Sequence, residues 1–540
     1  MKQRWPWVFI AVMTLVGVGL RVYEYNLSLT GDELSTLWIV KNYGLADTVH
    51  VVKGDAEITP PLYFVLAWLS TQLGSAPELV RLPAMLAGVA SIPLMYVLGL
   101  RTIGRSAGLI AATLFALSPS MIYFSANGRN YSVMVFLLIA STVTMLAGAR
   151  TGRTRWWVLF GVATCLAMYS HYTAVFVLGG QLAWLLWAYP KSRRPALIAT
   201  AVAAVAFLPW LPGMMADLDS PTTVILEVLQ GKGFDAKRTG FEVWAFGQPL
   251  VLPDAMPGNT VIAVILAGLA VAVGGIAFNT LRAAEGLRER LRRMPREVVL
   301  VAVLALATPV CEAILLAFGT DLLGARNLTA SYFGLILAFS ALLVSAGMIW
   351  GTLACVLVIG GFAFSAGKVL TDDAGNPDFI GASDYIEAES KPDDVVIDAF
   401  GAGLSPVPLA PMDLYLDRSH PLYPINRPSS LPPFLPFSVK IPSPTKLMRD
   451  AFRQAGDRRI YLVKPDALAI SSADDLGNEG LDRNQPTWIG RELVLPADAR
   501  IVEEKRFDSI DPPTVLVIRN GKSGDDAKKK PKPSQKTVSP

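Results

Sequence analysis

The chain has 540 residues, of which 52% are hydrophobic and only 17% charged, and its formal net charge is +4. Soluble domains carry about 25% charged residues, so this composition and a mean hydropathy of +0.42 exclude an ordinary soluble protein. A charge balance so close to neutral gives no indication of a nucleic-acid partner, because basic residues in membrane proteins mainly set orientation. The three cysteines lie in apolar runs without CxxC spacing, which predicts neither a disulfide framework nor a zinc site.

Apolar runs long enough for membrane-spanning helices occur along most of the chain, since a span needs about 20 such residues. The first run could also be a cleaved signal peptide, but it lacks a small-residue cleavage site, so an uncleaved anchor is expected. The shorter run 60–74 is expected to be a helix on the membrane surface. About eleven spans are predicted, near residues 5–22, 82–100, 106–125, 132–149, 156–170, 173–189, 195–213, 259–279, 297–318, 328–346 and 350–368.

The basic loops indicate the orientation of these spans. With the N-terminus in the cytoplasm, every short basic cluster falls on the cytoplasmic side, as the positive-inside rule requires. Counting 60–74 as a full span would place these clusters outside. The opposite face then receives the long first loop, residues 23–81, and everything after about residue 369. The clusters contain Arg101 and Arg105, Arg150, Arg153 and Arg155, Lys191, Arg193 and Arg194, and the basic stretch 281–297.

The chain is expected to divide into a membrane domain, residues 1–368, and a soluble α/β domain, residues 369–520, outside the cytoplasm. SDYIEAESKPDDVVIDAF and LMRDAFRQAGDRRIYLVK each predict a helix followed by a strand, and PPTVLVIRN predicts a last strand. The Pro-rich stretch 404–444 between the two helix–strand units is expected to be an irregular loop. Residues 521–540 contain few apolar residues, which predicts a disordered tail.

Five short segments, all predicted to lie at the outer membrane face, carry polar groups that suit a reaction site. Together they would place two carboxylates, two arginines and a histidine around one cavity. This set of groups fits a site that binds an anionic phosphate and moves a proton. The segments are GDE (31–33) with Asp32 and Glu33, TPPLYF (59–64), NGRNYS (127–132) with Arg129, SHYT (170–173) with His171, and GARN (324–327) with Arg326.

The order of these motifs resembles the integral-membrane glycosyltransferases of the GT-C fold, in particular the protein O-mannosyltransferase and aminoarabinose-transferase (ArnT-like) superfamily. The resemblance covers about residues 5–345 and rests on the Asp-Glu pair, the Pro-Pro-Leu-Tyr element, SPSMIYFSANGRNYSVMVFLL, SHYTAVF and FLPWLP. The chain departs from the family pattern at three places. Thr59 replaces a common histidine, whose role is absent or moved to His50; Asn127 replaces an acid; and Arg326 is followed by Asn327 in place of an aromatic residue.

The resemblance implies transfer of a sugar from a polyprenyl-phosphate donor to an acceptor hydroxyl or amine, with inversion of configuration. In that scheme Asp32 is the general base and Glu33 orients it or binds the acceptor. Arg129 and Arg326 hold the donor phosphate. The resemblance also implies a bacterial inner membrane, with the C-terminal domain in the periplasm. Further side chains expected at the substrates are His171, Tyr131, Tyr63, Tyr172 and Glu312.

Each of these residues also has a simpler interpretation. Asp32 and Glu33 could cap the helix that follows them, and Arg129 could anchor the chain at the lipid headgroups. Arg326 could pair with Asp321 and have no other role.

The remaining candidates have alternatives too. His171 could be a hydrogen-bonded structural residue, and Glu312, inside an apolar run, could pair with an arginine near the outer face. Asp55 and Glu57 could join Asp32 around a divalent cation, but the ligand spacing is too irregular to predict a metal.

Three other functions fit parts of the pattern. A carrier or flippase for a lipid-linked substrate usually places its ionisable residues near the bilayer midplane and shows repeated halves, whereas here the charges gather at one face. A polymerase or ligase that uses a lipid-linked oligosaccharide would differ mainly in donor size. A non-catalytic assembly subunit would not need so many spans. The sugar, and whether the acceptor is a glycan, a lipid or a protein, are not determined.

Overall fold

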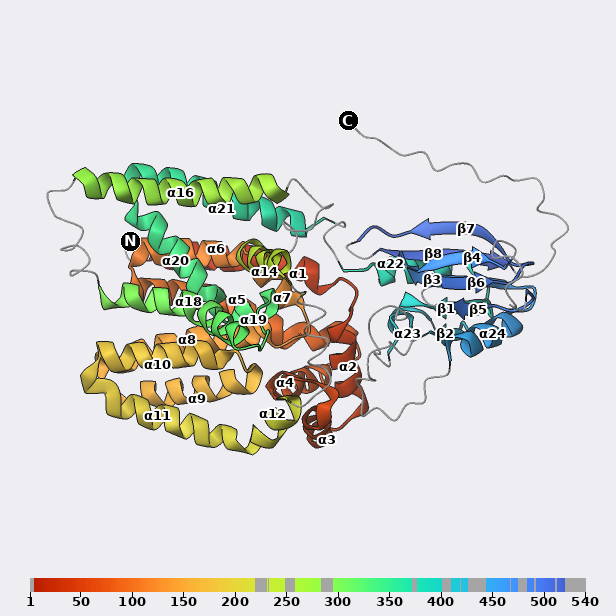
Figure 1. Cartoon of the computed structure of the whole chain (residues 1–540), viewed down its shortest axis with the longest axis horizontal. Coiled ribbons are helices and arrows are strands. Elements are labelled where there is room, and N and C mark those ends of the chain that lie inside the picture. Colours follow the sequence, from red (N-terminus) through yellow and green to blue (C-terminus); the bar gives the residue numbers. More distant parts are fainter. Residues whose placement is uncertain are drawn as a thin grey trace. The chain divides into compact units, whose positions relative to one another are not determined.

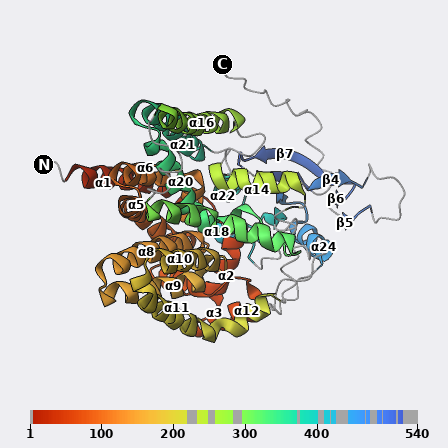
Figure 2. The same ribbon diagram turned by 60° about the vertical axis from the view of Figure 1, so that its left-hand side comes forward.

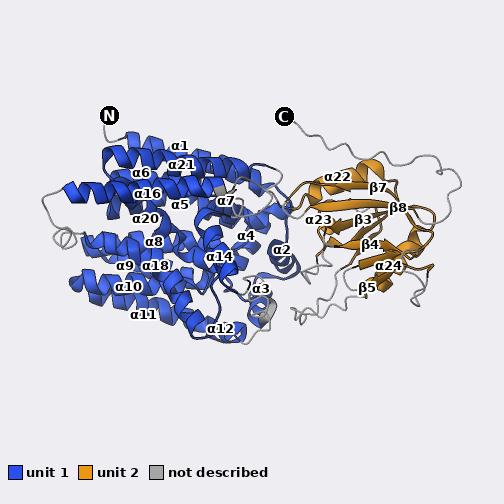
Figure 3. Cartoon of the chain, turned by 45° about the horizontal axis from the view of Figure 1, so that its top comes forward, with its two compact units in different colours: residues 1–376, 430–439 blue, residues 377–429, 440–540 orange. Residues whose placement is uncertain are grey.

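The computed structural model shows a helical unit followed by an α/β unit (Figure 1). Unit 1 comprises the described residues up to Asn376, and unit 2 comprises those from Pro377 onward (Figure 3). The structure describes residues 4–218, 231, 233–247, 258–282, 295–371, 376–400, 409–417, 419–425, 443–466, 468–473, 483–489, 492–509 and 512–519. Most of the basic stretch 281–297, most of the Pro-rich stretch 404–444 and the whole tail 521–540 lie outside these ranges.

Each of the eleven apolar runs forms helix in unit 1. The corresponding elements are α1 (Trp5–Tyr25), α5 (Leu82–Thr102), α6 (Arg105–Ala116) with α7 (Pro119–Ala126), α8 (Tyr131–Thr151), α9 (Thr154–Ser170), α10 (Ala174–Ala188), α11 (Arg193–Phe207), α16 (Gly258–Arg282), α18 (Arg296–Ala317), α20 (Tyr332–Ser345) and α21 (Met348–Val369). Among the described residues, eight helices are long and apolar enough to cross a membrane, or nine if the bent pair α6 and α7 is one span. The number eleven is therefore not confirmed, because α9 and α10 have only 17 and 15 residues.

Shorter helices gather at one end of unit 1. There α2, α3, α4 and α12 lie together, as Figures 1 and 2 both show. The run 60–74 forms α4, a short helix rather than a span, as predicted. The short elements are α2 (Asp32–Asn42), α3 (Leu45–Val51), η1 (Val52–Ala56), α4 (Leu62–Thr71), η2 (Pro77–Arg81), η3 (Pro190–Ser192), η4 (Leu208–Trp210), α12 (Leu211–Leu218), α14 (Phe234–Phe246), α19 (Ala325–Leu328) and η5 (Thr329–Ser331).

The bend between α6 and α7 has a chemical cause. The two helices meet at 56°, because Pro119 has no N–H to continue the helix and Ser118 caps the new one by accepting from the Met121 N–H at 3.2 Å. The buried guanidinium of Arg21 donates to the carbonyl oxygens of Ala116 (3.2 Å) and Phe115 (3.5 Å), which end α6. The bend directs α7 into the turn that carries Arg129.

Unit 2 is built on a five-stranded sheet in the order β2-β1-β3-β8-β7, in which β1 is parallel to β2 and β3, and β8 is antiparallel to β3 and β7. α24 packs on one sheet face and α22 with α23 on the other. A second sheet has the order β4-β6-β5. The elements are α22 (Phe379–Glu389), β1 (Val395–Asp398), α23 (Met412–Tyr415), β2 (Leu422–Pro424), α24 (Pro444–Ala455), β3 (Arg459–Pro465), β4 (Ala469–Ser472), β5 (Thr487–Ile489), β6 (Glu492–Leu495), β7 (Arg500–Arg506) and β8 (Pro513–Arg519).

The predicted class, a multi-pass helical membrane protein with a C-terminal α/β domain, is confirmed. Both helix–strand units and the last strand form where they were expected, as α22 with β1, α24 with β3, and β8. The expectation of an irregular loop over 404–444 is wrong for its described part, which contains α23 and β2. β2 has only three residues, which is too short for a strand pattern to be visible in the sequence. Its backbone hydrogen bonds come from pairing with β1.

Candidate active site

The site begins where α2 begins. Gly31 precedes the helix with φ 47° and ψ −118°, a conformation that favours glycine, and Asp32 is the first helical residue. Successive side chains on a helix point about 100° apart. Asp32 and Glu33 therefore point in different directions, and the structure gives them different partners. Gly31 is the N-cap residue, so Asp32 does not cap the helix, but Asp32 and Glu33 both lie in its first turn, where acidic groups are favoured by the helix dipole.

Glu33 lies inside the protein. Its carboxylate forms a two-pronged ion pair with Arg81, at 2.6 and 2.7 Å, and accepts the backbone N–H of Gly128 at 2.6 Å. Both side chains are almost completely buried. Arg81 also donates to the carbonyl oxygens of Tyr25 and Ser28. The expectation that Glu33 faces the substrates is therefore corrected: it ties the first loop to the start of α5 and to the turn before α8.

Asp32, unlike Glu33, forms an ion pair that is partly exposed. Arg326 Nη1 donates to Asp32 Oδ2 at 2.8 Å, and the two side chains remain 50% and 44% exposed. The alternative pairing of Arg326 with Asp321 is not seen, because Asp321 pairs with Lys237 at 2.7 Å. The structure thus brings together the predicted base and one predicted phosphate-binding arginine, 294 residues apart in the chain.

Arg129 is held more firmly than Arg326. Its guanidinium forms a two-pronged ion pair with Glu57, at 2.9 and 3.0 Å, donates to Thr36 Oγ1 at 3.3 Å, and lies 6.0 Å from the centre of the Phe64 ring. Glu57 also accepts the hydroxyl of Ser35 at 2.9 Å. Both charged side chains are about nine-tenths buried. Glu57 is thus the partner of Arg129; the side chain of Asp55 lies outside the described residues.

Electrostatics keep Asp32 in its charged form. Burial acts to raise the pKa of Asp32, but the charges of Arg326 and Arg129 outweigh it and hold the pKa below its usual value. An ionised carboxylate between two guanidinium groups is able to accept a proton. The two guanidinium groups are each paired with a carboxylate here, and their N–H groups are donors that suit a phosphate.

His171 lies behind Arg129 in the turn between α9 and α10. Its Nδ1 accepts the backbone N–H of Thr173 at 3.2 Å and lies 2.9 Å from the Thr173 hydroxyl, and its ring packs on Tyr131. Burial and the nearby charge of Arg129 lower the pKa of His171 to about 4. The imidazole is therefore neutral at physiological pH, which favours its structural interpretation.

The three tyrosines that were expected to contact the substrates lie in different surroundings. Tyr131 is mostly buried and packs between Phe124 and His171. Tyr63 is turned inward and donates to the Val80 carbonyl at 2.8 Å, so its hydroxyl does not reach the site. Tyr172 is also directed elsewhere, and Asp217 of α12 accepts its hydroxyl.

Glu312 and His50 also depart from expectation. Glu312 is completely buried in α18 and, among the described residues, forms no ion pair with an arginine. His50 is exposed on α3, and no contact links it to the charged residues of the site. Glu312 therefore lacks the expected arginine partner, and His50 does not lie beside the charged residues of the site.

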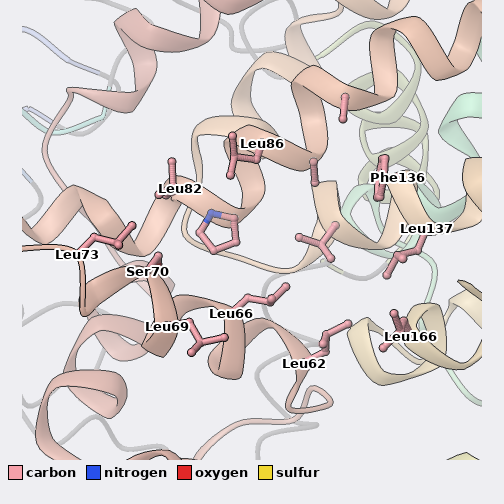
Figure 4. Close-up of a pocket in the computed structure, with 14 residues that line it drawn as sticks. Leu62, Leu66, Leu69, Ser70, Leu73, Leu82, Leu86, Phe136, Leu137 and Leu166 are labelled. Atoms are coloured by element: carbon pink, nitrogen blue, oxygen red, sulfur yellow. The ribbon is translucent and has the colours of Figure 1, made fainter. Parts of the chain in front are cut away.

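An apolar groove of about 580 Å³ runs beside the charged residues, between α4, α5, α8 and α9 (Figure 4). Leu62, Leu66 and Leu69 of α4, with Leu73 just after the helix, recur at helical spacing and line it, while Phe64 lies on another face of α4 beneath Arg129. The walls from α5 and α8 begin within the first turn of each helix, just after Arg81 and Arg129. The remaining lining residues are Ser70, Leu82, Pro83, Leu86, Ala87, Ala90, Val133, Phe136, Leu137 and Leu166.

Comparison with known proteins supports the resemblance seen in the motifs. Residues 59–212 match the family described as dolichyl-phosphate-mannose-protein mannosyltransferase. The resemblance to this superfamily is confirmed over that segment, which includes α4, Arg129 and His171. The mannosyltransferase-like protein YkcB of Bacillus subtilis (strain 168) is 31% identical over 98 residues, which are 18% of this chain and 14% of that relative. The chain thus matches only about a seventh of the relative's length.

Two solved structures of glycosyltransferases have a similar course of the chain. One is the Archaeoglobus fulgidus oligosaccharyltransferase AglB with an inhibitory peptide and a dolichol-phosphate, at TM-score 0.48 and 15% identity, covering 86% of this chain and 70% of that one. The other is ArnT from Cupriavidus metallidurans bound to undecaprenyl phosphate, at TM-score 0.39 and 13% identity, covering 96% and 98%. At TM-scores below 0.5, neither likeness carries an argument about fold, substrate or mechanism.

Proposed function

We propose that this protein is a membrane glycosyltransferase that moves a sugar from a polyprenyl-phosphate donor to an acceptor hydroxyl or amine. One observation carries the proposal: Asp32 is half-exposed and paired with Arg326, and the charge of Arg129 also acts on it. A carboxylate that is ionised and open to solvent suits a general base. Two guanidinium groups beside it suit the phosphate of the donor. The family match over residues 59–212, whose description names a dolichyl-phosphate sugar, supports the same donor class.

The proposed reaction is a single displacement. The acceptor oxygen or nitrogen attacks the anomeric carbon as Asp32 takes its proton, and the bond between that carbon and the phosphate oxygen breaks. The phosphate leaves with the bonding electrons as polyprenyl phosphate, and the arginines stabilise its growing charge. A single displacement at the anomeric carbon inverts its configuration. Retention would need a second carboxylate that first attacks as a nucleophile.

The apolar groove would hold the first part of the polyprenyl chain. Its α8 wall begins within the first turn of that helix, and Arg129 lies in the turn just before α8, so the hydrocarbon of a donor whose phosphate is near Arg129 would enter the groove along α8. Burying apolar surface contributes about 25 cal/mol per Å². In this scheme the groove supplies affinity for the lipid, and the arginines fix the position of its head.

The test uses the purified full-length protein in detergent with a panel of radiolabelled polyprenyl-phosphate sugars. We expect at least one donor to bind, and sugar to be released slowly to water or to a simple acceptor. Asp32→Asn should still bind the donor, but its rate of sugar release should fall by about 10²-fold or more, the usual contribution of a general base. Asp47→Asn is the matched control, since Asp47 is an exposed carboxylate on α3, and it should behave as wild type.

Two results would contradict the proposal. If wild type bound no monophosphate donor, the donor class would be wrong, and binding of a diphosphate-linked oligosaccharide would favour a polymerase or ligase. If Asp32→Asn released sugar at the wild-type rate, Asp32 would not be the base.

A further inference from the structure

The two arginines at the site are held in very different ways. Arg129 is buried and makes three side-chain hydrogen bonds, two to Glu57 and one to Thr36. Arg326 makes a single hydrogen bond to Asp32, and half of its side chain is exposed. Exposed single-contact ion pairs contribute little to stability, about 0–1 kcal/mol. Arg326 can therefore change partners at small cost, whereas Arg129 cannot.

A phosphate is a stronger partner for Arg326 than the carboxylate is. The donor phosphodiester has two non-bridging oxygens, so Arg326 could hold it with two hydrogen bonds, whereas Asp32 accepts only one from it. The same Asp32 carboxylate, if it stayed beside a bound phosphate, would repel it. Both effects favour replacement of Asp32 by the phosphate at Arg326.

We propose that the donor phosphate displaces Asp32 from Arg326, so that the base becomes free only after the donor has bound. This inference rests on the proposed function, because it assumes that a polyprenyl phosphate enters this site. Before binding, Asp32 is the counterion of Arg326; after binding, it faces the acceptor. An acceptor that arrives first meets a base that is still engaged.

The charged and titratable groups around Asp32 are consistent with this sequence of events. Arg326 of α19 and Arg129 of the turn before α8 act on Asp32, and Tyr123 of α7 and Tyr131 of α8 lie within reach of the same charges. Before a phosphate binds, the charges of Arg326 and Arg129 hold the pKa of Asp32 below its usual value, although burial acts to raise it. When a phosphate neutralises Arg326, part of that effect is removed, and the affinity of Asp32 for a proton rises.

The experiment measures equilibrium binding, without acceptor, of the same panel of radiolabelled polyprenyl-phosphate sugars to the purified full-length protein. Four proteins are compared at one pH and one salt concentration: wild type, Asp32→Asn, Arg326→Gln and the double variant. We expect Asp32→Asn to bind at least about threefold more tightly than wild type, since the phosphate no longer competes with a carboxylate. We expect the same substitution to improve binding much less in the Arg326→Gln background, where there is no pair to break.

The cycle separates exchange from simple charge removal. An equal gain from Asp32→Asn in both backgrounds would show only repulsion by the carboxylate and would overturn the proposed exchange, as would unchanged or weaker binding by Asp32→Asn. Asp32→Ala repeats the measurement if the asparagine variant is not monodisperse. No binding by wild type or by any variant would instead overturn the proposed function itself, so the two failures are distinguishable.

Discussion

Asp32 and Glu33 are adjacent in the chain, yet their carboxylates bind two arginines that are far apart in the sequence, Arg326 and Arg81. Glu33 is buried with Arg81, which lies at the end of η2, while Asp32 is half-exposed with Arg326 of α19. One carboxylate therefore joins the first loop to the helices, and the other remains available at the surface of the site.

The buried pair Glu33–Arg81 should be important for stability. Glu33→Gln leaves the Arg81 guanidinium buried without its counterion, and breaking such a pair costs about 3–5 kcal/mol. We expect a clear fall in the midpoint of thermal unfolding in detergent. Glu297→Gln is the control, because it removes the partner of Arg150 from a more exposed pair and should cost about 1 kcal/mol or less. Equal effects of the two substitutions would contradict this prediction.

Lysine should replace the two arginines unequally. Arg129→Lys loses the two-pronged pair with Glu57 and the position over Phe64, so we expect lower donor affinity and a lower unfolding midpoint together. Arg326→Lys keeps a cation at an exposed single contact, so donor affinity should fall by less and the unfolding midpoint should stay close to that of wild type. Equilibrium donor binding and thermal unfolding of the same preparations provide both readouts. A large loss of stability in Arg326→Lys would show that its pair with Asp32 is structural.

Filling the apolar groove should affect only long donors. Ala87→Phe places a ring inside the groove, so we expect about tenfold weaker binding of an undecaprenyl-phosphate sugar, equivalent to about 1.4 kcal/mol. A donor with one or two isoprene units should bind this variant as it binds wild type. Leu100→Phe, at an exposed position of the same helix outside the groove lining, is the matched control. Equal weakening of short and long donors would assign the polyprenyl chain to another surface.

His171 should make folding sensitive to acid. Its pKa is about 4 in the folded protein, because burial and Arg129 lower it, and about 6.5 in the unfolded chain. The unfolded chain therefore binds an extra proton between these values, and stability falls as pH drops from about 6.5 towards 4, by up to about 3 kcal/mol. We expect His171→Asn to lose less stability than wild type between pH 7.5 and pH 4.5, measured by thermal unfolding in detergent. Parallel losses in the two proteins would show that His171 does not titrate this way.

Local composition was enough to predict the helices and the class of the protein. Apolar runs of span length become helices because a chain in lipid must satisfy its backbone hydrogen bonds internally, and alternating helix and strand patterns identified α22 with β1 and α24 with β3. Motif order also brought Asp32, Arg129, His171 and Arg326 to notice as candidates. The break at Pro119 shows the limit of this information: the proline predicts an interruption, but the support of α6 by Arg21 depends on contacts 94 and 95 residues apart.

Partner choice was decided only by the tertiary structure. Arg81 belongs to none of the motifs. It is a charge directly before a long apolar run, however, and such a charge is a reasonable signal for a buried partner. Glu57 was considered only as a cation ligand. Which carboxylate meets which arginine depends on the direction of each side chain from its helix and on how much water each pair retains. A sequence lists the charges of these loops, but packing determines that Glu33 and Glu57 are buried in ion pairs while Asp32 stays half-exposed.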